Sequence, residues 1–279
     1  MSLRISNLSV PEILPPPGIS MECEPGSVTG IIGPNGAGKS TLIKALYGRM
    51  PGATGSVCLD GTELTAMRPA EQAARLAVVP QDTSSGGEYS VADMVGLARS
   101  PHLGRFGLFR GEDHERVARA LAITGMSAFA ERPVNRLSGG QRQLAHIARA
   151  ICQDTPVILL DEPVSDLDIR HELTVLRLLQ RLARQGRTIL VVLHNLESAA
   201  RFCDRLVLLS EGRLVSQGPP AEVLDAPTLA THYRVRARVG RDPDTHALRV
   251  SVLDAIEDAD DPHARTSSPF TSSQKEETP

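Results

Sequence analysis

The feature that most constrains how this chain folds is a glycine-rich segment of the form GxxxxGK[ST], made of Gly33, Pro34, Asn35, Gly36, Ala37, Gly38, Lys39, Ser40 and Thr41. The apolar run at 28–32 before it predicts a buried strand, and the apolar residues over 42–46 recur with helical spacing. A phosphate-binding loop requires this order of strand, loop and helix, because the loop amides and the helix N-terminus then face the anion. We therefore predict that Lys39 reaches the β- and γ-phosphates of a nucleotide and that the Ser40 hydroxyl binds Mg²⁺.

Further apolar runs predict the rest of an α/β fold. We expect strands at 57–59, 77–79, 157–160, 189–193 and 206–209, and edge strands over 1–27 that a turn at 15–18 interrupts. The residues from 91 to 152 have a helical pattern, and leucines spaced by three over 173–182 predict another helix. Strands that alternate with helices indicate a parallel sheet.

Composition narrows the class of protein. Aromatic residues make up 3% of the chain and Trp is absent, so the core must be aliphatic, as in an α/β sandwich. The formal charge of −3 gives no reason to expect nucleic acid as a partner. Four scattered cysteines without a CxxC pair predict neither a zinc site nor a disulfide framework. No apolar run is long enough to span a bilayer and no secretory signal is visible, so we expect an intracellular protein that can dock on a membrane protein.

Two acids follow the apolar strand at 157–160. Asp161 and Glu162 therefore lie at the C-terminal edge of the predicted sheet, where open α/β sheets bind their ligands. There Asp161 can hold Mg²⁺ directly or through water. Glu162 can take the proton of an attacking water, or orient that water.

A second turn with free backbone amides is predicted at Leu137-Ser138-Gly139-Gly140-Gln141, directly before a good helical pattern over 142–150. Ser138 is a natural N-cap, and the two glycines expose N–H groups at the start of the helix. Such a turn on its own usually means only helix capping. Together with the first loop, it predicts a second anion site separate from the first.

The three segments together, GPNGAGKST at 33–41, LSGGQ at 137–141 and VILLDEP at 157–163, resemble the nucleotide-binding subunit of an ABC transporter over about residues 3–225. The resemblance implies an α/β fold: a P-loop NTPase (RecA-like) core with a parallel sheet, an N-terminal antiparallel β subdomain and an inserted α-helical subdomain. The ABC ATPase domain then spans 1–225, with the helical subdomain at about 88–152. Residues 226–253 form a C-terminal extension, and the acidic, Ser/Thr-rich residues 254–279 are expected to be a disordered tail.

The resemblance also assigns roles to single residues. Gln81 matches the Q-loop glutamine, which senses Mg²⁺ and contacts the permease, and His194 matches the switch histidine that contacts the γ-phosphate. The implied catalytic residues are Glu162, His194 and Gln81, and the implied Mg²⁺ ligands are Ser40, Gln81 and Asp161. Residues 165–168 match the D-loop. Two subunits face head to tail in this family, so the residues implied to contact the partner's ATP are Ser138, Gly139, Gly140, Gln141 and Asp168.

The chain departs from the family pattern at one position. ABC subunits usually carry an aromatic residue near the end of the first strand that stacks on adenine. Glu12 or Ile13 stands near that place here, and no Tyr, Phe or Trp lies nearby in the sequence. The hypothesis that follows is weaker adenine stacking and looser base selectivity.

Three further segments, at 97–105, 193–213 and 217–223, are similar to ATPases that power uptake of iron-siderophores, haem and cobalamin. The resemblance implies an ATP-binding and ATP-hydrolysing importer subunit that uses Mg²⁺. Its implied partners are a second copy, two transmembrane permease subunits and an extracytoplasmic substrate-binding protein, with no nucleic acid. Its implied location is peripheral, on the cytoplasmic side of the inner membrane.

Two alternatives stay open at this stage. The first is a soluble ABC-type assembly or scaffold ATPase that works without a permease. The second is a nucleotide-binding regulator that no longer hydrolyses, which Glu162 and His194 disfavour. A zinc site at His102 is not expected because no second ligand has suitable spacing, and His171-Glu172 lacks the second His of an HExxH protease motif.

Overall fold

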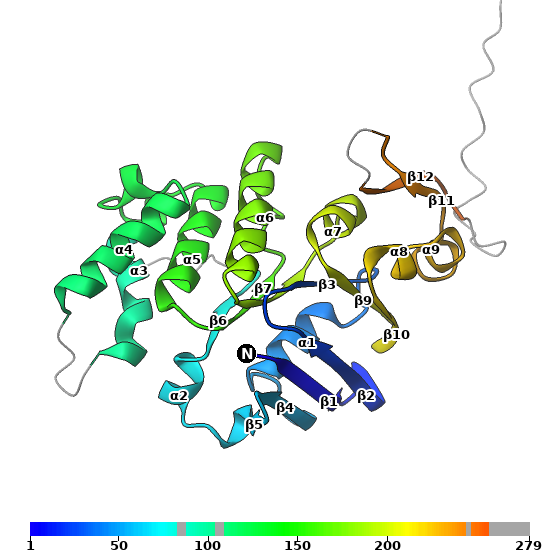
Figure 1. Cartoon of the computed structure of the whole chain (residues 1–279), viewed down its shortest axis with the longest axis horizontal. Helices are drawn as coiled ribbons and strands as arrows, with labels where there is room; N and C mark the ends of the chain where they lie inside the picture. The colour runs from blue at the N-terminus through cyan, green and yellow to red at the C-terminus, as the bar shows by residue number, and fades with distance from the viewer. Residues whose placement is uncertain (83–87, 104–108, 244–246, 257–279) are drawn as a thin grey trace, which may run out of the picture.

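Among the residues that the computed structural model describes (1–82, 88–103, 109–243 and 247–256), six strands form a central sheet in the order β10-β9-β3-β8-β7-β6. Its members are β3 (Val28–Ile32), β6 (Leu76–Val79), β7 (Val157–Asp161), β8 (Thr188–Val192), β9 (Arg205–Ser210) and β10 (Arg213–Gly218). Every neighbouring pair is parallel except β9 and β10. The strands β3, β7 and β8 are buried along their whole length, because other elements cover both faces of the sheet (Figure 1).

An antiparallel sheet packs below the central one. Its order is β2-β1-β4-β5, with β1 (Leu3–Val10), β2 (Leu14–Cys23), β4 (Thr54–Leu59) and β5 (Thr62–Glu63). Helix α1 (Lys39–Leu46) packs into the same apolar cluster as this sheet. The turn predicted at 15–18 is wrong: these residues belong to β2, as an irregularity in its pairing with β1. An edge strand accommodates the three prolines because a missing N–H costs no ladder bond on its open side.

Helices between β6 and β7 gather at one end of the molecule (Figure 1). They are α3 (Val91–Gly96), α4 (Gly111–Ile123) and α5 (Gly139–Gln153), joined by short 3₁₀ turns, and α6 (Ile169–Arg184) follows β7 beside them. A buried ion pair holds this part together, with Arg99 Nε 3.0 Å from Asp113 Oδ1. Arg99 Nη1 also donates to the Cys152 carbonyl at 3.0 Å, so one guanidinium links three segments. Of the segment predicted at 97–105, Gly104 and Arg105 lie outside the described residues.

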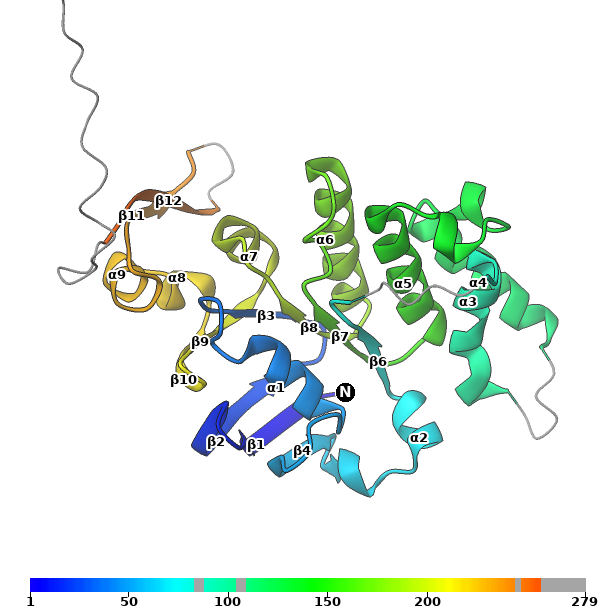
Figure 2. The same ribbon diagram turned by 180° about the vertical axis from the view of Figure 1, so that it is seen from behind.

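The C-terminal part lies at the opposite end, as Figure 2 shows from behind. It contains α7 (Leu196–Phe202), α8 (Pro220–Val223), α9 (Ala226–Tyr233) and a hairpin of β11 (Val235–Arg241) and β12 (Leu248–Ala255). Asp254 and Ala255, which the sequence analysis assigned to the tail, belong to β12. Arg236 Nη2 donates to Asp254 Oδ2 at 2.6 Å and ties that end of the hairpin together. Ile256 follows β12 and its amide donates to the Arg234 carbonyl at 2.8 Å, and residues 257–279 of the predicted tail lie outside the described residues.

The core is aliphatic, as the composition predicts. Alternate residues of each strand face opposite sides of the sheet. In β7, for example, Ile158 and Leu160 join one apolar cluster, and Val157 and Leu159 join the other. All four cysteines are free, and no described helix is long and apolar enough to cross a membrane. The predicted fold class is confirmed: a parallel core sheet, an antiparallel sheet and an inserted set of helices.

Candidate functional site

The glycine-rich loop joins β3 to α1 and leaves free amides at the helix start. Gly38 is the N-cap of α1 with φ +91°, and it offers no side-chain acceptor to the first turn. The first amides of a helix have no partner within the helix. A loop of this shape is therefore a ready anion site, because free N–H groups and the positive end of the helix dipole point the same way.

The Lys39 side chain folds back over this loop. Its Nζ donates to the Gly33 carbonyl at 2.8 Å and to the Pro34 carbonyl at 2.9 Å, and the residue is 5% exposed. Burial lowers the pKa of Lys39, while the nearby carboxylates of Glu162 and Asp161 oppose that shift. A cation held at the centre of the loop can bind phosphate oxygens there with little water between them.

Two oxygen donors meet beside the loop. Ser40 Oγ donates to Asp161 Oδ1 at 3.0 Å, and Asp161 is 2% exposed at the end of β7. Burial raises the pKa of Asp161, and the Ser40 hydroxyl opposes the shift. A hydroxyl and a carboxylate fit Mg²⁺, which prefers oxygen ligands and usually takes one or two from protein and the rest from phosphates and water. Among the described residues no cluster of three or more His, Cys, Asp and Glu forms another metal site.

The ends of three neighbouring strands bring together the three residues predicted to be catalytic. Gln81 follows β6, Glu162 follows β7 and His194 lies just after β8. Gln81 Nε2 donates to Glu162 Oε2 at 2.8 Å, and His194 Nε2 lies 2.5 Å from Glu162 Oε1. Both carboxylate oxygens of Glu162 are thus held in one orientation, which suits a group that must meet a single water molecule.

A cavity of 620 Å³ joins these parts. The residues that line it are Ile13, Asn35, Gly36, Ala37, Gly38, Lys39, Ser40, Thr41, Gln81, Glu162 and His194. No aromatic residue is among these lining residues. Ile13, which is 40% exposed, lines the cavity near the sequence position where the family usually has an aromatic residue. Gly33 and Pro34 do not line the cavity and contribute the carbonyls that hold Lys39.

The residues predicted to act on a partner's nucleotide do not line this cavity. Ser138 is the N-cap of α5, and its Oγ accepts from the Gln141 amide at 3.3 Å. Gly139 and Gly140 form the first turn of that helix. Asp168 is the N-cap of α6, and its Oδ1 accepts from the His171 amide at 2.9 Å, a hydrogen bond that lowers the pKa of Asp168. Both helix starts thus present amides outside the chain's own site.

One contact to the loop has no signal in the sequence. Tyr233, at the end of α9, is hydrogen-bonded to the backbone of Gly33, and burial raises the pKa of its hydroxyl. A single Tyr in a C-terminal segment matches no motif, so sequence reasoning missed it. His102, where no zinc site is expected, places its Nε2 at 2.7 Å from the Gln153 carbonyl at the end of α5.

The position of Ile13 depends on a tight turn between β9 and β10, and this gives a first prediction. Gly212 has φ +72°, and a Cβ on it would lie 1.9 Å from the Ile13 carbonyl oxygen. We expect Gly212→Ala to lower the free energy of unfolding by about 2–4 kcal/mol, from left-handed strain plus the clash. The matched control is Gly61→Ala, with φ +81° and nothing within 4 Å, which should cost about 1 kcal/mol. Urea unfolding measures both, and equal losses would contradict the role of the Ile13 contact.

Comparison with known proteins gives consistent matches. The family model described as ABC transporter matches residues 17–165. The chain is 42% identical over 229 residues to the cobalamin import ATP-binding protein of Halobacterium salinarum. The matched region covers 82% of this chain but only 57% of that longer protein. It is 42% identical over 259 residues to the hemin import ATP-binding protein of Pseudomonas aeruginosa. That match covers 89% of this chain and 99% of the hemin import protein. A solved structure of a metal-chelate type ABC transporter in an inward-facing conformation matches this chain with a TM-score of 0.75 and 27% sequence identity. The match covers 91% of this chain and 97% of the matched transporter chain.

Proposed function

Because the chain belongs to the ABC transporter family, we propose that it is the subunit that binds and hydrolyses ATP to power an importer of metal chelates. The observation that carries this proposal is the position of Glu162, held by Gln81 and His194 in the same cavity as the phosphate-binding loop. A binding module without hydrolysis has no need of an oriented carboxylate beside the phosphates.

Binding of ATP begins at the loop. The amides over 36–41 cradle the β- and γ-phosphates, and Lys39 neutralises part of their charge. Ser40 and Asp161 would hold Mg²⁺, with Gln81 completing the set from the neighbouring strand. The chemistry that Mg²⁺ supplies when bound is neutralisation of charge on the phosphate oxygens. Ser40 and Asp161 already lie within hydrogen-bond distance, so little rearrangement is needed to form the pair of ligands.

Hydrolysis needs a water in line with the γ-phosphate. Glu162 accepts a proton from that water, or orients it, while Gln81 and His194 fix the two carboxylate oxygens. His194 is positioned to contact the γ-phosphate as well, since its ring lines the cavity at the end of β8. The three side chains therefore act as a unit, and loss of any one should disturb the other two.

A second copy completes the site. One chain carries a phosphate loop with its own cavity and, elsewhere, an exposed turn at Ser138 with free helix amides. In a two-fold, head-to-tail pair, each turn covers the partner's nucleotide and Asp168 lies beside it. ATP then joins the copies, and hydrolysis removes the γ-phosphate that bridges them. The pair of subunits would close when ATP binds and open after ATP is hydrolysed.

An importer subunit of this kind works at the membrane, where its permease partners lie. We infer that this chain contacts permease subunits, and the similar proteins named as import ATP-binding proteins support that partner. The names of the similar proteins, which import cobalamin and hemin, support a metal chelate as the cargo. A binding protein outside the membrane would deliver it, and this chain would lie on the cytoplasmic face of the inner membrane.

The test of the proposed function is purification of the tagged chain from its native membranes in mild detergent, followed by identification of what accompanies it. Copurification of a permease with many membrane spans, in equal amount, is the expected result. Recovery only with soluble assembly factors would favour the scaffold ATPase instead. The Glu162→Gln variant is the best bait for this copurification, because it should keep ATP bound without hydrolysing it.

The cavity wall at Ile13 predicts weak discrimination between bases. An aliphatic side chain cannot stack on a base as an aromatic ring does, so ATP and GTP should be hydrolysed with comparable kcat/KM. Ile13→Tyr should lower KM for both nucleotides at least about fivefold, since a base on an aromatic ring gains about 1–3 kcal/mol. Ile13→Leu is the control and should leave KM unchanged. Strong preference of the unmodified chain for ATP would contradict this prediction.

A further inference from the structure

A second cavity, larger than that at the phosphate loop, lies between α4 and α6 above the end of α5. Its volume is 780 Å³, against 620 Å³ for the first. Both views show α5 between α4 and α6 (Figures 1 and 2). Its apolar floor is made of Ala120, Ile123, Ile151, Leu178 and Leu182. We call it the arginine groove after the four guanidiniums on its walls, Arg116, Arg119, Arg181 and Arg187.

One carboxylate of the groove serves two of these arginines. Asp154 caps the end of α5 with φ +58°, and its Oδ2 accepts from Arg116. Its Oδ1 accepts from Arg187 Nη2 at 2.7 Å. Arg187 Nη1 is buried without a hydrogen-bond partner, and burial lowers the pKa of Arg187. The guanidinium of Arg187 is therefore desolvated. Its charge is only partly balanced by the Asp154 carboxylate, which it shares with Arg116.

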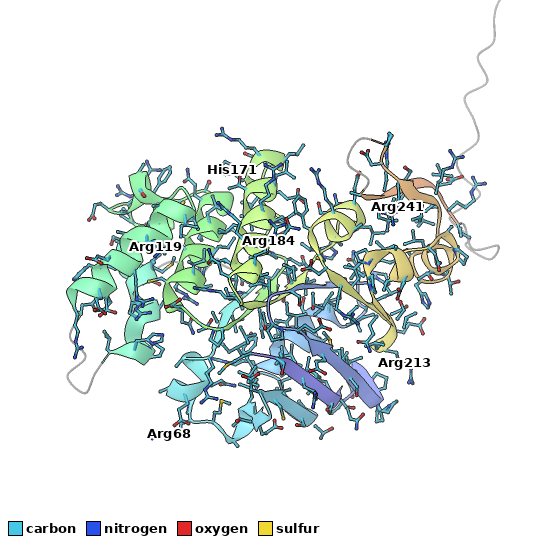
Figure 3. The ribbon with its side chains drawn as sticks, in the orientation of Figure 1. Arg68, Arg119, His171, Arg184, Arg213 and Arg241 are labelled. Carbon is cyan, nitrogen blue, oxygen red and sulfur yellow. The ribbon has the colours of Figure 1, made fainter. Side chains whose placement is uncertain are left out.

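The other two arginines have no ion partner in the part of the chain that the structure describes. Arg119 lies on α4, where Figure 3 labels it, and Arg181 lies on α6. Neither forms an ion pair, although Glu112 and Glu115 also line the groove. Glu115 precedes Arg119 by four residues, a spacing that permits a pair along the helix. With four arginines and three carboxylates, the groove keeps one net positive charge and two uncommitted guanidiniums.

We propose that the arginine groove binds a small molecule that carries a phosphate group. A guanidinium binds a phosphate through two parallel hydrogen bonds, and a phosphate brings about two negative charges to a groove whose own charge is positive by one. The volume lies within the range of about 300–1,000 Å³ that is typical of small-molecule sites. It exceeds what a free phosphate fills, so an organic part of the ligand would cover the apolar floor. This proposal does not depend on the proposed function.

The ligand would tie two parts of the chain together. Arg116 and Arg119 belong to the helices inserted between β6 and β7, whereas Arg181 and Arg187 flank the connection from α6 to β8. A phosphate bound between these walls adds charge-assisted contacts that cross from one part to the other. Binding should therefore raise the melting temperature of the chain as well as produce heat.

The test uses the full chain with Lys39→Ala, which weakens the phosphate loop, and inorganic pyrophosphate as the probe in isothermal titration. Arg119→Gln with Arg181→Gln should weaken pyrophosphate binding at least about tenfold, since each charged hydrogen bond is strong. The matched control is Arg177→Gln with Arg184→Gln, two exposed α6 arginines outside the groove, which removes the same charge. It should change affinity less than twofold.

Arg187→Gln provides a third variant, because it removes the buried guanidinium rather than the exposed ones. Weaker binding in both groove variants, with melting temperatures near that of the parent, is the expected result. No detectable pyrophosphate binding by the parent would overturn the proposal. Equal weakening in the groove and control variants would also overturn it, because a general charge effect or the phosphate loop would then account for binding.

Discussion

Glu162→Gln is expected to reduce ATP turnover at least about a hundredfold while leaving ATP bound. The amide keeps the shape of the side chain and its place between Gln81 and His194, but it cannot accept a proton from water. General base catalysis contributes about 10²–10⁴-fold to enzymatic rates, which sets the scale of the loss. ATP should bind at least as tightly as before, because one negative charge near the phosphates is gone.

Glu197→Gln is the matched control for this variant. Glu197 is an exposed carboxylate in the first turn of α7, three residues after His194, and it does not line the cavity. Its loss should leave turnover within about twofold. Steady-state phosphate release and binding of a fluorescent ATP analogue measure the two effects. Near-normal turnover by Glu162→Gln would remove Glu162 from the reaction and leave Asp161 or His194 as the candidate base.

The sequence predicts the residues of the site better than their surroundings. Local patterns predict Lys39, Ser40, Asp161 and Glu162, because a glycine loop between a strand and a helix indicates a phosphate site, and two acids at the end of a buried strand in the same chain fit beside it. That they meet follows from the parallel part of the sheet, where β3, β6, β7 and β8 all end at one edge. Gln81 needed the family resemblance, since a lone Gln at the end of a strand has no chemistry that its neighbours reveal.

Long-range packing is what the sequence does not reveal. The contact from Tyr233 to Gly33 joins positions far apart in the chain, and no periodicity within α9 indicates it. The Pro and Gly residues at 15–18 predict a turn, as they do in most contexts, whereas the chain continues there as an irregular part of β2. The arginine groove is hidden for the same reason: its walls come from α4 and α6, and only the fold brings Arg119 and Arg181 to one cavity.

Ser138→Arg is expected to abolish ATP-dependent pairing of two copies, provided the exposed turn covers a partner's nucleotide. Ser138 is exposed and does not line the chain's own cavity, so a single copy should bind ATP as before. The long Arg side chain would occupy the space between the turn and the partner's nucleotide, so the free amides at the start of α5 could no longer reach the γ-phosphate. In a Glu162→Gln background, light scattering should show a dimer with ATP, and the added Ser138→Arg should leave a monomer.

The control for that result is Ser138→Ala, because both substitutions remove the hydroxyl that caps α5. Loss of the cap alone costs about 1 kcal/mol of helix stability, and the Gln141 amide loses its 3.3 Å acceptor in either case. Ser138→Ala should therefore still form the dimer, at a somewhat higher concentration of ATP. If Ser138→Arg pairs as readily as Ser138→Ala, the turn lies outside the interface and each site must be complete within one chain. If both fail, the cap itself rather than the interface is at fault, and thermal unfolding of the two variants would show the same loss.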